Sequence, residues 1–333
     1  MIFQPASIAL LLASTVCVAI LFAAAPFAIQ VIRHWDITSG SERQLQLERR
    51  TYLFSTLTVF VMATQLLSLL LFVFNADKMS IMFVGAMCAV GTLNVNAWGF
   101  PALIAQMTVF FLAAGWLAVN HVDSRAPDYP LTRIKYAALL VLLPAVAAVL
   151  WLQLKYFANL RADVITSCCG SLFSEDTKGL TGDMAALPPA AAMVAFYTAL
   201  SLAFATAAFH AQTGRAGVWV GVTSLASFGM ALAGIISFVS LYIYEHPHHH
   251  CPFCILKPEY DWQGYWLYLP LFVATACGIG VGAVQPFRSI DSLREVIPRV
   301  STRLAGIAAA CLLLFAAVAT ILIVRSNLVL LGS

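Results

Sequence analysis

Long apolar runs alternate along the chain with short polar stretches. Eight of these runs reach the roughly 20 residues that an α-helix needs to cross a bilayer. They cover 8–32, 51–74, 101–119, 137–157, 189–211, 217–243, 265–285 and 304–324. Backbone polar groups that face lipid must bond within their own segment, so these runs should be helical. The pattern predicts an all-α, polytopic membrane helix bundle with about eight transmembrane helices.

Composition supports this interpretation. The 333 residues are 61% hydrophobic and only 10% charged, whereas soluble domains carry about 25% charged residues. There is no long basic run of the kind that nucleic-acid-binding proteins use, and no Walker A or GxGxxG-plus-acid motif. We therefore predict one membrane domain over 1–333, with the lipid bilayer as its surroundings and no nucleic-acid partner.

Lysine and arginine are distributed unequally between the connections. Twelve lie in the connections after the first, third, fifth and seventh spans, and six lie on the other side. Cytoplasmic loops carry the excess of positive charge, which places both termini outside. The protein is then a multi-pass protein of the bacterial inner membrane. Its outer loops, at about 75–100, 158–188 and 244–264, form a cysteine-rich periplasmic face.

The cysteines are sorted by location. Cys17, Cys277 and Cys311 lie in apolar spans and are expected to be small packing residues. All the others lie in the predicted outer loops: Cys88, Cys168, Cys169, Cys251 and Cys254. Because extracytoplasmic compartments are oxidising, this grouping indicates redox chemistry or stable crosslinks.

Cys251 and Cys254 form a CxxC motif, whose spacing lets two sulfurs meet and exchange disulfides. The segment Cys251-Pro252-Phe253-Cys254-Ile255-Leu256-Lys257 resembles the CxxC segment of DsbB-type and vitamin K epoxide reductase-type membrane oxidoreductases. The resemblance covers about ten residues and does not extend to the fold. It implies electron transfer between protein thiols and a quinone, with Lys257 helping to hold the quinone. Trp266 and Tyr268 are further candidates for lining a quinone pocket.

The same loops are also rich in soft metal ligands. Thiolates and thioethers suit Cu(I), and imidazole suits copper and zinc. The candidate ligands are Met79, Met82, Met87, Cys88, Cys168, Cys169, His246, His248, His249, His250, Cys251 and Cys254. This set predicts, as an alternative, a protein that captures, transfers or transports copper or mercury.

The leading prediction from sequence is a membrane thiol-disulfide oxidoreductase or electron-transfer protein. Cys251 and Cys254 would exchange electrons with Cys88 or with the Cys168 and Cys169 pair. Its partner would be a periplasmic thioredoxin-like protein, whereas the metal alternative implies a metallochaperone. A third alternative is a structural subunit of a larger membrane complex. The sequence leaves the cofactor open between a quinone and copper.

The span interiors contain few polar side chains. The main ones are Gln65, Gln106 and Gln153. Glutamine side chains hydrogen-bond across helices in membranes. We therefore expect these three to join neighbouring helices rather than to carry chemistry.

Overall fold

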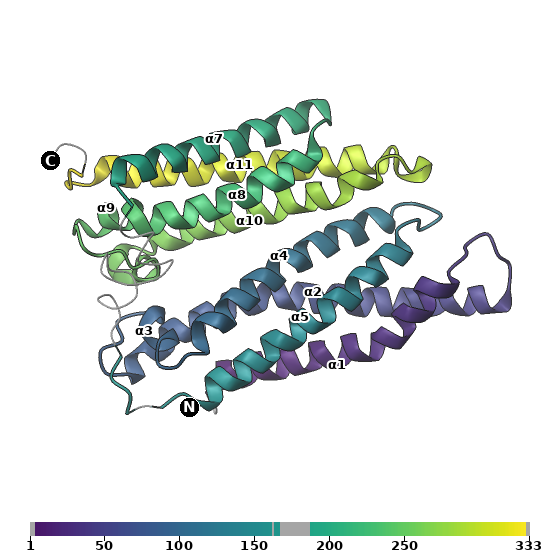
Figure 1. Cartoon of the computed structure of the whole chain (residues 1–333), viewed down its shortest axis with the longest axis horizontal. Coiled ribbons are helices and arrows are strands. Elements are labelled where there is room, and N and C mark those ends of the chain that lie inside the picture. The colour runs from purple at the N-terminus through teal and green to yellow at the C-terminus, as the bar shows by residue number, and fades with distance from the viewer. Residues whose placement is uncertain (1–3, 162, 167–186, 331–333) are drawn as a thin grey trace. The chain divides into compact units, whose positions relative to one another are not determined.

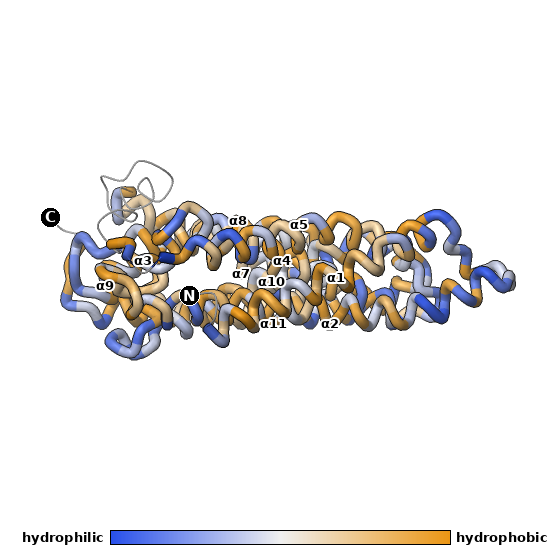
Figure 2. Tube along the Cα trace, turned by 90° about the horizontal axis from the view of Figure 1, so that it is seen from below, coloured by the Kyte–Doolittle hydropathy of each residue, from blue (hydrophilic) through white to orange (hydrophobic). Residues whose placement is uncertain are grey.

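The computed structural model describes residues 4–161, 163–166 and 187–330. Within these ranges every regular element is a helix, and eight helices are long and apolar enough to cross a membrane. Figure 2 shows hydrophobic residues filling these helices and hydrophilic residues gathering mainly in the connections. The prediction of an all-α, multi-pass membrane protein is confirmed.

Contacts divide the chain into two compact units, each described by itself. Unit 1 comprises Met1–Asn75, Asn96–Arg161 and Ala283–Val300, and unit 2 comprises Ala76–Val95, Ala162–Gly282 and Ser301–Ser333. The long helices of unit 1 are α1 (Pro5–His34), α2 (Glu42–Met79) as far as Asn75, α4 (Gly99–Asp123) and α5 (Thr132–Ala158) (Figure 1). Those of unit 2 are α7 (Pro189–Thr213), α8 (Gly217–Gly234) and most of α10 (Gln263–Val284) and α11 (Val296–Arg325).

Several short helices connect or extend the long ones. The 3₁₀ helices are η1 (Ser80–Met82), η3 (Cys254–Leu256), η4 (Pro258–Tyr260), η5 (Gln285–Phe287) and η6 (Asp291–Leu293). The short α-helices are α3 (Ala89–Leu93) and α9 (Ser240–Tyr244). A π-helix, η2 (Ile235–Val239), joins α8 to α9. Such π segments are rare and often mark functional sites.

The second long helix begins earlier than its apolar run suggests. It starts at Glu42 rather than near residue 51. Gln44, Leu47 and Thr51 are buried, while most residues between them are exposed. This spacing of three and four residues is the buried stripe of an amphipathic helix. The charged stretch before the apolar run therefore continues the helix.

Aromatic side chains form much of the core of unit 1. Phe27 of α1 stacks on Phe54 of α2 with ring centroids 4.7 Å apart, and meets Tyr136 of α5 edge-on at 5.5 Å. The Tyr136 hydroxyl donates a hydrogen bond to the Thr51 carbonyl oxygen at 3.2 Å. These contacts join three helices around one buried cluster.

A buried ion pair closes the connection between α4 and α5. The Lys135 Nζ lies 2.7 Å from Asp123 Oδ2, and both side chains are almost fully buried. Asp123 Oδ1 also accepts the Leu131 backbone N–H at 2.7 Å. Because each charge is paired and hydrogen-bonded, this network is suited to holding the turn.

In unit 2, α7 packs against α8 and contacts α11. Phe196 of α7 meets Phe315 of α11 with ring centroids 5.8 Å apart, and His210 Nε2 lies 3.1 Å from Ser301 Oγ. Phe228 of α8 meets Phe272 of α10 edge-on at 5.0 Å. These contacts link the four long helices of unit 2.

The buried glutamines of unit 1 make fewer hydrogen bonds than expected. Gln153 accepts a bond from the Ser14 hydroxyl at 2.8 Å, which joins α5 to α1 as predicted. The Nε2 atoms of Gln65 and Gln153 and both polar atoms of Gln106 have no partner among the described residues. A buried polar atom without a partner costs about 1 to 3 kcal/mol.

Replacing Gln106 by methionine should therefore raise the stability of the protein. We expect a gain of about 1 to 3 kcal/mol, because the change removes two unpaired polar atoms at similar volume. Gln153→Met should have the opposite sign, since it leaves the Ser14 hydroxyl without its acceptor. Thermal unfolding in detergent would measure both. A loss of stability in Gln106→Met would mean that this amide binds a buried water or another partner.

Candidate functional site

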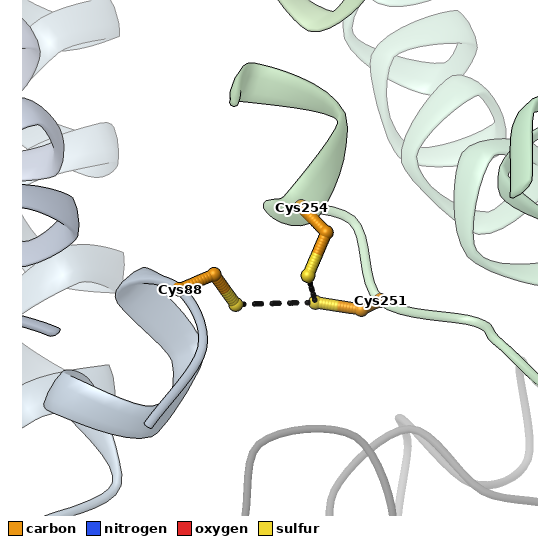
Figure 3. A group of neighbouring side chains, drawn as sticks. All are labelled: Cys88, Cys251 and Cys254. Carbon is orange, nitrogen blue, oxygen red and sulfur yellow. Dashed lines mark hydrogen bonds between the residues drawn. The ribbon is translucent and has the colours of Figure 1, made fainter. Parts of the chain in front are cut away.

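Three buried cysteines of unit 2 lie together. The Cys251 sulfur is 3.5 Å from the Cys88 sulfur and 3.5 Å from the Cys254 sulfur (Figure 3). All three sulfurs lie within 4.8 Å of one another. The exposed fractions of Cys88, Cys251 and Cys254 are 0%, 0% and 5%. Residues separated by more than 160 positions in the sequence therefore form one thiol cluster.

Cys88 is held by a tight loop. It lies in extended backbone immediately before α3. The Thr166 N–H donates to the Val84 carbonyl oxygen at 3.0 Å, and the Thr166 hydroxyl donates to the Gly91 carbonyl oxygen at 2.9 Å. Gly85 lies between these anchors with a φ of +85°, and a Cβ there would lie 2.1 Å from the Thr166 oxygen. Only glycine fits this approach of two backbone segments.

Two tyrosine hydroxyls hold the CxxC segment. Tyr244, the last residue of α9, donates to the Cys251 carbonyl oxygen at 2.5 Å. Tyr268 of α10 donates to the Pro252 carbonyl oxygen at 2.7 Å. Two successive buried carbonyls thus receive partners from two different helices, which satisfies them and fixes the backbone beside Cys251.

Cys254 begins the short helix η3. The Leu256 N–H bonds to the Phe253 carbonyl, and the Lys257 N–H bonds to the Cys254 carbonyl, both at 3.0 Å. This turn packs against the first residues of α10 at Gly264. A Cβ on Gly264 would lie 2.9 Å from side-chain atoms of both Ile255 and Leu256, so a larger residue there would push η3 away.

The cationic group nearest to the motif in sequence is already paired. Lys257 Nζ lies 3.9 Å from Asp77 Oδ1, near the end of α2, and both side chains are about one-fifth exposed. The predicted role of Lys257 in holding a quinone stays a prediction. Of the other two quinone-site candidates, Tyr268 bonds to the Pro252 carbonyl and Trp266 is 64% exposed.

The remaining sulfur candidates differ in position. Cys168 and Cys169 lie outside the described residues. Met79 is fully buried at the end of α2, whereas Met82 is 39% exposed and Met87 is 68% exposed. Met87 precedes Cys88 in the chain. An exposed thioether and a buried thiol therefore belong to consecutive residues.

The histidines become progressively more buried along their segment. His246 and His248 are exposed, and His249 is partly buried with its ring stacked on Tyr244 at a centroid distance of 4.0 Å. His250 is 3% exposed. Within the described part of the chain, the group of side chains placed to bind one metal ion consists of Cys88, Cys251 and Cys254. It includes no histidine.

Sequence reasoning missed the residues that position the thiols. Thr166 and Tyr244 carry no motif, and a tyrosine at the end of a membrane helix is commonly an interface aromatic. The only sequence signal for Gly85 and Gly264 was their place in turn-rich loops. The role of Gly85 depends on a contact with Thr166, which is distant in the sequence, and that of Gly264 depends on how η3 packs against α10.

The shape of the thiol cluster limits its chemistry. Two sides of the sulfur triangle are 3.5 Å and the third is at most 4.8 Å, so the angle at Cys251 is less than a right angle. In disulfide exchange a thiolate attacks along the axis of the bond that breaks, so the three sulfurs lie nearly in line. A metal ion bound equally by three thiolates, with metal–sulfur bonds of about 2.3 Å, separates the sulfurs by about 4 Å. The compact triangle is closer to the second arrangement.

Gly85→Ala should loosen the loop that carries Cys88. The added Cβ cannot coexist with the Thr166 carbonyl at its present distance, so the loop must move and Cys88 must become more accessible. Alkylation by N-ethylmaleimide, followed by mass spectrometry, should then show faster modification of Cys88 than in the parent protein. Gly40→Ala is the matched control, because nothing lies within 4 Å of its Cβ position. Unchanged Cys88 reactivity in Gly85→Ala would contradict this account of the loop.

Comparisons with known proteins give no relative from which to infer a role. No protein-family model, no curated protein and no solved structure matches the chain. The function must therefore be argued from the chemistry of the thiol cluster itself.

Proposed function

We propose that this multi-pass membrane protein binds a soft metal ion, Cu(I), at Cys88, Cys251 and Cys254 and serves in its capture or transfer. The observation that carries the proposal is the group of three buried sulfurs within 4.8 Å of one another. Thiolates are ligands of Cu(I), zinc and iron–sulfur clusters. Structural zinc sites almost always have four protein ligands, so the set of three found among the described residues favours Cu(I).

Burial gives a second argument for a metal. Thiolates in an apolar interior are costly unless a cation compensates their charge. Lys257, the nearest lysine or arginine along the chain, is paired with Asp77. A bound metal ion would supply the missing positive charge, and its binding would release the thiol protons.

The site is proposed to face the periplasm of a bacterial inner membrane, with both termini on that side. This rests on the excess of lysine and arginine in the other set of connections. The cluster joins the loop after α2 to the segment between α9 and α10. Both of these belong to loops for which charge predicts the outer side.

Sidedness can be tested with single cysteines placed in a variant whose native cysteines are replaced by serine. Val329→Cys lies beyond α11 at a position 75% exposed, and Asp291→Cys lies between α10 and α11 at a position 93% exposed. A membrane-impermeant maleimide should label Val329→Cys but not Asp291→Cys in cells with a permeabilised outer membrane. The reverse pattern would invert the proposed topology.

Metal binding should depend on all three thiols. Reduced full-length protein in detergent, titrated anaerobically with Cu(I) against a chromogenic chelator, should bind one ion per chain. Cys251→Ser should abolish binding, because Cys251 contacts both other sulfurs. Cys88→Ser and Cys254→Ser should each weaken it by at least about tenfold, since even outer-shell changes cost 10- to 100-fold. Cys311→Ser, in α11, is the control and should bind like the parent protein.

A thiol-disulfide oxidoreductase remains the second candidate function, favoured by the 3.5 Å contacts of Cys251 with both Cys88 and Cys254. Closing a disulfide requires a sulfur–sulfur bond of about 2.05 Å, and releases two protons and two electrons to a quinone or a partner disulfide. If the protein binds no Cu(I) but differential alkylation finds a Cys251 disulfide after incubation with a quinone, this candidate replaces the metal proposal. If the protein neither binds Cu(I) nor forms this disulfide, the third alternative applies: the cysteines stabilise a structural subunit of a larger membrane complex.

A further inference from the structure

In the segment before Cys251, the histidine side chains become less exposed as the chain approaches Cys251. His246 and His248 lie at the surface, with ring centroids 6.1 Å apart. His249 is partly buried, and His250, the neighbour of Cys251, is buried. The thiol cluster is therefore joined to the surface of unit 2 by a short run of nitrogen ligands.

His250 has the arrangement of a metal-ligating histidine. Its Nδ1 lies 2.9 Å from the carbonyl oxygen of Ile236, in the π-helix η2. A carbonyl can only accept, so Nδ1 carries a proton, and whenever the ring is neutral its Nε2 keeps a lone pair. Metal-binding histidines almost always donate their other ring N–H in this way.

The Nε2 of His250 lacks a hydrogen-bond partner among the described residues, although the side chain is 97% buried. A buried acceptor is normally paired, and an exception calls for an explanation. Since Nε2 is not within the group of three sulfurs, a fourth place in the resting cluster does not explain it. A ligand that occupies this nitrogen transiently does.

We infer that the segment His246–His250 is the access route by which the metal ion reaches the thiol cluster. The exposed pair His246 and His248 first takes the ion from outside, and the His250 Nε2 passes it to Cys251. The inference rests on the proposed function and adds a second, weaker binding site to it. Copper remains Cu(I) throughout: copper–nitrogen bonds break as copper–sulfur bonds form, and the thiol protons leave to solvent.

An access route changes the rate of loading more than the final affinity. Anaerobic stopped-flow mixing of the reduced full-length protein with chelator-buffered Cu(I) would measure that rate. The double variant His246→Gln/His248→Gln and the single variant His250→Gln should each load roughly tenfold more slowly, the size typical of outer-shell effects. Both should still bind one ion per chain at equilibrium. Glutamine at position 250 removes the imidazole lone pair.

The matched control is His34→Gln. His34 is exposed at the end of α1, in unit 1, and should not affect loading. If the variants at 246, 248 and 250 load at the parent rate while the parent binds Cu(I), the access route is wrong and the thiol site stands. A uniform slowing that includes His34→Gln would also overturn the inference.

A second measurement tests the histidines without the thiols. In the triple variant Cys88→Ser/Cys251→Ser/Cys254→Ser, weak Cu(I) binding should persist and should disappear when His246, His248 and His250 are also replaced by glutamine. Failure of the proposed function appears instead as a parent protein that binds no more tightly than this triple variant. Absence of any binding to the triple variant overturns the access route.

Discussion

The hydrocarbon interior of a membrane tolerates no unpaired backbone polar groups, and this constraint determines where the chain can carry chemistry. It requires helices that continue across the whole bilayer, and it leaves irregular backbone only where the helices end or where protein covers it. The thiol cluster follows this rule. Cys88 comes from the loop after α2, and Cys251 and Cys254 come from the segment between α9 and α10. The hydroxyls of Tyr244 and Tyr268 satisfy buried carbonyls that such an irregular segment leaves without backbone partners.

Positioning of the sulfurs depends on backbone contacts rather than on contacts among the sulfurs themselves. Sulfur hydrogen bonds are weak, and three neutral thiols gain little by meeting. Thr166 fixes one side through the carbonyls of Val84 and Gly91, and Tyr244 fixes the other through Cys251. The cluster is therefore built before any ligand arrives. Preorganisation of this kind lowers the ordering cost of binding and suits a site that must take up an ion quickly.

The sequence predicted those parts of the molecule that depend on local composition. The eight spans follow from apolar run length, although α2 starts nearer the N-terminus because Gln44 and Leu47 continue its buried stripe. The placing of Cys88, Cys251 and Cys254 in connections on one side of the spans followed from the order of the spans, and the side that they face stays a prediction from charge. The sequence left open whether Cys251 meets Cys88 or the Cys168 and Cys169 pair, because the meeting of Cys88 with Cys251 depends on contacts over 163 residues. The same limit applies to Gln106. Its amide is unpaired because the neighbouring helices place no hydrogen-bonding group of the described residues beside it.

The burial of the three sulfurs affects electron exchange and metal binding differently. Electron exchange with a protein partner requires one sulfur of that partner to reach a sulfur of the cluster, yet Cys88 and Cys251 have no exposed surface and Cys254 has little. Such exchange would demand that the segment held by Tyr244 and Tyr268 open. A bare metal ion is far smaller than a protein thiol and needs only a sequence of ligands closely spaced along its path. On the access route inferred above, the buried Nε2 of His250, the neighbour of Cys251 in the chain, would be the last of these ligands.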